Sequence, residues 1–224
     1  MHFSRFLMFK ITSLLAGALL AAGAAQAQTT GTQFGLKAGL TNAVLDGTIN
    51  TGAEPKNGFH LGGFVRWRPS ARFALQPELV YAQQGCDTRV VNTVPFEGQI
   101  KLNYLNVPIL AKVYLGKVFN LQAGPQIGFL LGAQREGQVM YSTVSGYKSE
   151  KVDVRDDYKN DLALCGGLGA DLPFGLIVAA RINYGLTDID KNPVTRAIRD
   201  SDSIIGGLHN RSLEFSLGYA FGGK

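Results

Sequence analysis

The sequence predicts an all-β fold, an eight-stranded antiparallel up-and-down transmembrane β-barrel preceded by a cleaved signal peptide. Three observations lead to this prediction. Eight segments alternate between an apolar face and a mixed face, as strands with two different surroundings do. The connections between these segments are alternately long and short, and aromatic residues gather at both ends of the apolar faces. Short inner turns, long outer loops and two aromatic girdles are typical of bacterial outer-membrane barrels.

The amino terminus predicts export from the cytoplasm. A basic start with Arg5 and Lys10 precedes an apolar run over 11–25, and Ala25-Gln26-Ala27 fits the small-residue cleavage rule. We therefore expect residues 1–27 to be a signal peptide and residues 28–224 to form one barrel domain. An uncleaved membrane anchor is the alternative, although the apolar run is short for a spanning helix.

The stretch 161–189 gives the clearest strand pattern, a hairpin that turns at Pro173-Phe174. In its second half, alternate positions from Leu176 to Leu186 are all apolar, while the intervening positions include Arg181 and Asn183. An apolar face of about ten residues matches what a tilted strand needs to cross a bilayer. We interpret the stretch as two membrane-spanning strands.

The other six strands follow from the same alternation, at Gln33–Thr41, Phe59–Arg68, Phe73–Gln83, Ile100–Leu115, Phe119–Leu131 and Arg211–Phe221. In the fourth of these the apolar parity changes near Leu105-Asn106, which predicts a β-bulge. The longest connections are expected at 133–160 and 188–210. A closed barrel leaves no unpaired strand edge in the bilayer, whereas a soluble sandwich would not explain the regular alternation of loop lengths.

Threading the strands up and down places the outward aromatic residues at two levels. The predicted aromatic girdles contain Phe34, Trp67, Phe73, Phe119, Tyr219 and Phe221 at the inner rim and Phe59, Tyr81, Tyr104 and Tyr184 at the outer rim. The outward positions between the rims carry essentially no charge. A soluble lipocalin-like binder would instead place its apolar residues inside, which makes it the weaker reading.

The inward positions are polar and predict a hydrogen-bonded interior. The predicted interior network contains Lys37, His60, Arg66, Arg68, Glu78, Lys112, Arg181 and Glu214. Lys101 is also expected inside. Eight strands enclose a space barely wider than their own side chains, and buried charges must be paired or hydrated. The sequence therefore favours a plugged interior. A narrow, weakly anion-favouring channel is the alternative, because cations outnumber carboxylates in this set.

No pattern points to an enzyme, a cofactor or a metal site. His60 and His209 are the histidines that remain after signal removal, and no spacing sets either beside a nucleophile. The net charge of +5 is too small and too scattered to indicate nucleic-acid binding. Cys86 and Cys165 lie on non-adjacent strands, so a disulfide would have to cross the lumen, and two inert thiols are the favoured reading.

Five segments resemble the PorT-like outer-membrane β-barrel family of Gram-negative bacteria. They are FGLKAGL at 34–40, LQPELVYAQQG at 75–85, LNYLNVPILAKVY at 102–114, LQAGPQIGFLLG at 121–132 and RINYGLTDI at 181–189. The resemblance implies an eight-stranded barrel in the outer membrane, of the kind often labelled a porin family without demonstrated porin activity. It also implies insertion by the barrel-assembly machinery, whose usual terminal aromatic signal is here followed by Gly222-Gly223-Lys224.

The expected function is structural or interactive. We expect the barrel to contact outer-membrane lipid through its wall and an unidentified protein partner through its long outer loops. No cofactor and no nucleic acid is expected.

Overall fold

The computed structural model describes residues 31–47, 53–89, 97–142, 146–193, 196–197 and 207–222. The predicted signal peptide lies outside these residues. The strands are β1 (Gly31–Asp46), β2 (Ala53–Arg68), β3 (Phe73–Arg89), β4 (Glu97–Leu115), β5 (Phe119–Ser142), β6 (Gly146–Asp153), β7 (Asp161–Asp171), β8 (Leu176–Gly185) and β9 (His209–Phe221). Two short 3-10 turns, η1 (Arg155–Asp157) and η2 (Pro173–Gly175), flank β7. Within the part of the chain described, no helix is long and apolar enough to cross a membrane.

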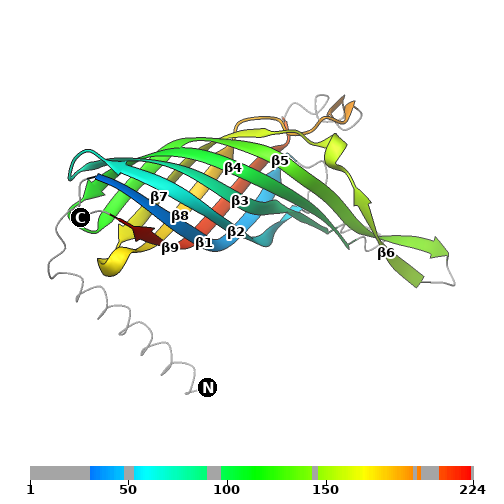
Figure 1. Cartoon of the computed structure of the whole chain (residues 1–224). Helices are drawn as coiled ribbons and strands as arrows, with labels where there is room; N and C mark the ends of the chain where they lie inside the picture. Colours follow the sequence, from blue (N-terminus) through cyan, green and yellow to red (C-terminus); the bar gives the residue numbers. More distant parts are fainter. Residues whose placement is uncertain are drawn as a thin grey trace, which may run out of the picture.

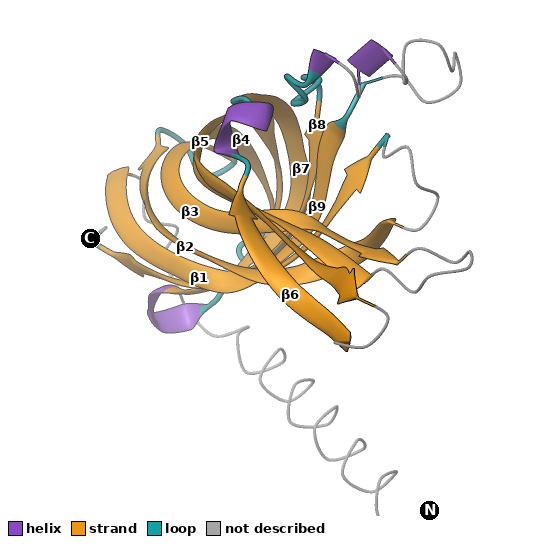
Figure 2. Cartoon of the chain, turned by 90° about the vertical axis from the view of Figure 1, so that its right-hand side faces the viewer, coloured by secondary structure: helices purple, strands orange, loops and turns teal. Residues whose placement is uncertain are grey.

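Eight of these strands form a closed antiparallel barrel, as predicted. The ring runs β1-β2-β3-β4-β5-β7-β8-β9, and β9 returns to pair with β1. The pairing of Phe34 with Phe221 brings the start of β1 and the end of β9 together at the inner end, beside the three short turns. Figure 2 shows the ring from the opposite, outer end.

β6 is an additional strand outside the ring. It pairs with the last part of β5, where Gln134 lies opposite Asp153 and Ser142 opposite Gly146. This hairpin projects beyond the barrel (Figure 1). The predicted connection at 133–160 is therefore wrong in part, because its first half is strand rather than loop. Backbone groups need hydrogen-bond partners above the membrane as well as within it, and a continued ladder supplies them.

Other strands also extend further outward than the apolar alternation does. β2 begins at Ala53 rather than Phe59, and β3 ends at Arg89 rather than Gln83. Outside a bilayer a strand does not need an apolar outward face. The alternation therefore marks the lipid-facing part of each strand and not its full length.

The wall is apolar outside and polar inside. Large apolar side chains are exposed around the ring, among them Leu36, Leu40, Leu61, Leu79, Ile127, Leu168, Ile182, Phe215 and Leu217. The opposite parity carries buried polar and charged groups. This is the reverse of a water-soluble barrel, and it fits a wall surrounded by lipid.

The bulge predicted in β4 is wrong. Against β3 the register of β4 is continuous, and the irregularity with β5 lies on the β5 side, near Leu131. Leu102 and Tyr104 therefore share the inward parity of Asn106 and Lys112. Leu102 and Tyr104 are apolar because the barrel interior is apolar at that level, and not because their side chains point outward.

Candidate functional site

The structure places the whole predicted interior network inside the barrel. All eight side chains are buried: Lys37, His60, Arg66, Arg68, Glu78, Lys112, Arg181 and Glu214. They come from β1, β2, β3, β4, β8 and β9, on positions that alternate with lipid-facing residues. Lys101, in contrast, has a partly exposed side chain on the outward parity of β4, so its predicted inward position is wrong.

Glu78 is the centre of the network. Its carboxylate accepts a hydrogen bond from the Lys37 ammonium at 3.0 Å and a bidentate pair from the Arg181 guanidinium at 3.0 Å each. The Gln76 amide donates a further bond at 2.8 Å. A bidentate arginine–carboxylate pair is both strong and geometrically specific. Glu78 thus joins β1, β3 and β8 across the lumen.

The network continues from Gln76 to the inner end of the barrel. Arg66 Nε donates to Gln76 Oε1 at 2.7 Å, and Arg66 Nη1 forms an ion pair with Asp171 at 2.8 Å. The Tyr114 hydroxyl donates to the same carboxylate at 2.8 Å. The Arg68 guanidinium stacks on the Tyr114 ring, 3.7 Å from its centroid. A continuous polar chain therefore runs from mid-barrel to the inner rim.

Two carboxylates of this interior were not in the predicted network, although the alternation of 161–171 places Asp171 on the face opposite the apolar one. Asp171 pairs with Arg66, and Asp161 is buried near the outer end of β7, where it accepts a bond from Asn210. Both share the inward parity of Ala163 and Cys165, and that shared parity is the signal that could have identified them. With both added, the interior carries less excess positive charge than the sequence predicted.

His60 lies between two hydroxyl groups. Its Nδ1 is 3.0 Å from Thr41 Oγ1, and its Nε2 is 2.8 Å from Ser216 Oγ. A serine next to a histidine is also the arrangement of an activated nucleophile. Here all three residues are buried inside the barrel, and the third group is a threonine and not a carboxylate. The arrangement serves to link β1, β2 and β9.

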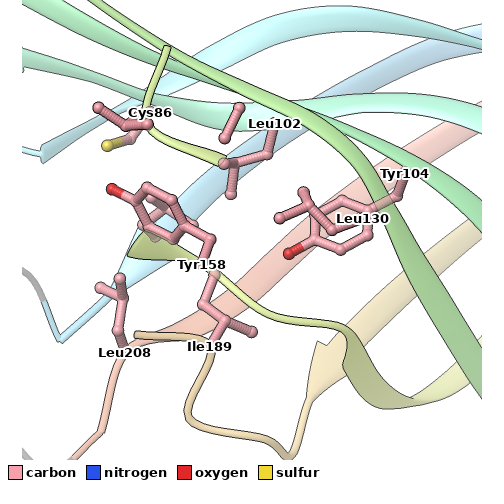
Figure 3. Close-up of a cluster of buried hydrophobic side chains, with 10 residues drawn as sticks. Cys86, Leu102, Tyr104, Leu130, Tyr158, Ile189 and Leu208 are labelled. Atoms are coloured by element: carbon pink, nitrogen blue, oxygen red, sulfur yellow. The ribbon is translucent and has the colours of Figure 1, made fainter. Parts of the chain in front are cut away.

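Above the polar network, an apolar cluster fills the outer mouth of the barrel. We call it the cap; its buried members are Leu45, Cys86, Leu102, Tyr104, Leu130, Ala133, Val154, Tyr158, Ile189 and Leu208. Leu45 comes from β1, whereas Leu102 and Leu130 come from β4 and β5 on the opposite side of the ring. The cap therefore reaches across the lumen (Figure 3).

Two outer connections supply four cap residues, Val154, Tyr158, Ile189 and Leu208, and backbone hydrogen bonds hold these connections in place. The Val154 amide donates to the Ala133 carbonyl at 3.0 Å, and the Ile189 amide donates to the Leu208 carbonyl at 2.8 Å. Lys159 joins the two connections, because its amide donates to the Ile189 carbonyl at 3.0 Å. Burial in the cap raises the pKa of the Tyr158 hydroxyl above its ordinary value.

Nine of the ten predicted girdle residues have outward, at least partly exposed side chains. Tyr104 is the exception and is only 1% exposed. Its predicted place in the outer girdle is wrong, because the inward parity of β4 carries it into the cap. Its hydroxyl donates to the Lys159 carbonyl at 3.2 Å. The two cysteines are buried free thiols, and no group of three or more metal-ligating side chains occurs in the described ranges.

A pocket of about 410 Å³ lies beside the cap. It is lined by Leu130, Arg155, Tyr158, Lys159, Asn160 and Lys191. Three of these residues are cationic, and they come from the same two connections that close the barrel. We call this pocket with its lining the loop platform.

The match to a family model agrees with this architecture. Residues 24–191 match the family model described as outer membrane protein beta-barrel domain. The attachment invasion locus protein Ail of Yersinia pestis is 13% identical, with 86% of this chain and 100% of that chain covered and a TM-score of 0.47. Neisserial surface protein A is 9% identical, with 85% and 99% covered and a TM-score of 0.47. The outer membrane protein OprG of Pseudomonas aeruginosa is 14% identical, with 88% and 99% covered and a TM-score of 0.42. A search of curated protein sequences finds no significant match.

Proposed function

Because the chain belongs to the outer membrane protein β-barrel domain family and resides in the cell outer membrane, we propose that it is a non-conducting barrel that presents its outer loops to a partner. The observation that carries this proposal is the cap. Apolar side chains from opposite walls meet across the outer mouth, above an interior joined by hydrogen bonds from Lys37 to Tyr114. Such an interior holds the shape of the barrel and opposes the passage of solutes.

The loop platform supports the interaction part of the proposal. Arg155, Lys159 and Lys191 surround one pocket, and the apolar contacts of Val154 and Ile189 fix the connections that carry them. A preformed surface loses less conformational entropy on binding than a mobile loop does. The partner that fits this surface carries an anionic group. We propose no catalytic role, because the Ser216 hydroxyl next to His60 is buried inside the barrel.

Within the family, we propose that the chain is a PorT-like barrel. The support is the set of five segments quoted above, which span most of the barrel in the order found in that group.

Electrical recording tests the non-conducting barrel against its alternative, a narrow, weakly anion-favouring channel. The purified chain, folded into planar lipid bilayers, is expected to give no single-channel steps. Ile189→Asp, which places a charge in the cap, should raise the leak if the cap is the seal. Regular, anion-selective steps from the unmodified chain would overturn the proposal.

Capture from native outer membranes tests the interaction. The triple variant Arg155→Gln, Lys159→Gln, Lys191→Gln removes the three cations of the loop platform. We expect it to retain at least tenfold less of the partner that the unmodified chain retains. The matched control Arg72→Gln, Lys117→Gln, Lys151→Gln removes the same charge from exposed positions outside the loop platform and should retain the partner. Equal retention of the partner by both variants would contradict the proposal that the loop platform binds it.

A further inference from the structure

A second pocket lies on the outer surface of the wall, on the β2–β5 side. Its volume is about 360 Å³, and it is lined by Lys56, Lys101 and the asparagine and glutamine side chains of β2, β3, β4 and β5. No apolar residue is among its lining residues. We call it the rim pocket. It is separate from the loop platform, with which it shares no residue.

Strand parity places most of the rim-pocket lining on the outer side of the wall, and the buried Gln84 is the lining residue that comes from the inward parity. Gln83 lies opposite Asn103 on neighbouring strands, and the next residues along, Gln84 and Leu102, face inward and are buried. Because side chains alternate along a strand, Gln83 and Asn103 point away from the lumen. The pocket is therefore open to whatever surrounds the barrel at this height.

The outer aromatic girdle fixes that height. The Tyr81 hydroxyl donates to Asn103 Oδ1 at 3.1 Å, so a girdle residue is bonded directly to the pocket lining. The Tyr81 ring in turn packs on the Phe59 ring, with centroids 5.9 Å apart. Girdle aromatics sit where hydrocarbon meets headgroups. The rim pocket thus begins at the level of the outer-leaflet headgroups.

The groups in the pocket suit a phosphorylated sugar. The Lys56 ammonium donates to Gln99 Oε1 at 2.6 Å and lies 3.4 Å from Asp87, and the Lys101 ammonium donates to Glu136 at 3.1 Å. Each ammonium has three donors, so the contact with Glu136 leaves Lys101 with donors for a phosphate. Primary amides donate and accept, as sugar hydroxyls require. A phospholipid headgroup without a sugar would contact the lysines through its phosphate but would form few hydrogen bonds with the amides.

We propose that the rim pocket binds the phosphorylated glucosamine headgroup of a lipopolysaccharide molecule in the outer leaflet. The lysines contact the phosphate and the amides contact the sugar hydroxyls. This inference rests on the position of the barrel in the outer membrane and not on the loop partner. The bound lipid anchors one side of the barrel at a defined depth.

Native mass spectrometry of the detergent-solubilised full chain with added diphosphoryl lipid A tests the proposal. We expect a one-to-one adduct that is weaker with dephosphorylated lipid A and weaker again with phosphatidylglycerol. Lys56→Gln combined with Lys101→Gln should weaken the lipid A adduct by about tenfold, the loss of roughly 1.4 kcal/mol. Gln83→Trp, which fills the pocket without changing its charge, should weaken it as well.

The matched control is Lys117→Gln combined with Arg211→Gln. It removes the same charge from the inner turn and from the side of the rim that carries Tyr184. Heat-dependent gel migration shows whether each variant is folded. Equal adducts in the control and the rim-pocket variants, or equal binding of phosphatidylglycerol and lipid A, would overturn the proposal.

Discussion

The polar interior and the cap are two cores in one barrel, and they are built on opposite principles. At membrane level the interior is held by directed bonds, such as those that Glu78 accepts from Lys37 and Arg181. At the outer mouth the contacts of Leu102, Ile189 and their neighbours are apolar and undirected. Lipid tails surround the first region, whereas headgroups and water surround the second. Apolar burial stabilises a fold where water is the alternative, whereas side chains facing lipid gain little from it.

The largest expected effect comes from breaking the polar core at its centre. Glu78→Gln leaves the buried Lys37 and Arg181 without their carboxylate. Removing one partner of a buried ion pair costs about 3–5 kcal/mol, because an uncompensated charge remains. Trp67 is the single tryptophan, and its side chain faces outward, so its fluorescence during urea unfolding in lipid vesicles measures the change.

Lys37→Met is the matched control for this prediction. It removes one cation and leaves the bidentate pair between Arg181 and Glu78 intact. We expect a smaller loss of unfolding free energy than for Glu78→Gln. A Glu78→Gln variant as stable as the unmodified chain would mean that water, and not the protein, satisfies these cations.

An intermediate effect is expected in the cap. Ile189→Ala removes buried apolar volume from a fully buried side chain, which costs about 2–3 kcal/mol in a region that can partly relax. The loss should be local. Hydrogen exchange of the Val154, Lys159 and Leu208 amides should accelerate while the membrane-level strands stay protected. Uniform acceleration throughout the barrel would show that the cap and the polar core unfold as one unit.

Sequence alternation was enough to predict the barrel and the residues that face its interior at membrane level. Lipid outside and polar groups inside impose a strict period of two on each strand. Arg66, Lys112 and Glu214 each have apolar neighbours on both sides in their strand, so their inward direction could be read from the parity alone. The parity could not predict which cation pairs with which carboxylate. The pairing of Glu78 with Arg181 depends on which strands face each other across the ring.

The sequence did not predict the cap, because apolar alternation marks outward-facing residues within the bilayer but inward-facing residues above it. Ile100, Leu102 and Tyr104 are apolar, and within the bilayer apolar residues on a barrel strand face lipid. Above the girdle the surroundings are headgroups and water, so apolar side chains there turn inward and polar ones such as Lys101 turn outward. Sequence periodicity alone does not mark the height at which this reversal occurs. A β4 that kept its apolar residues facing lipid across this boundary would need a bulge, and the structure instead keeps the register of β4 continuous with β3.

Tyr104 lies at this boundary and gives the smallest and sharpest test of the comparison. Its ring belongs to the cap, and its hydroxyl donates to the Lys159 carbonyl, so it combines both kinds of interaction. Tyr104→Phe keeps the ring and removes one hydrogen bond, which should lower the unfolding free energy by about 1 kcal/mol. Tyr104→Leu also removes the ring contacts and should cost more. If Tyr104→Phe alone cost as much as Ile189→Ala, directed bonds rather than apolar contacts would hold the cap, and the contrast between the two cores would fail.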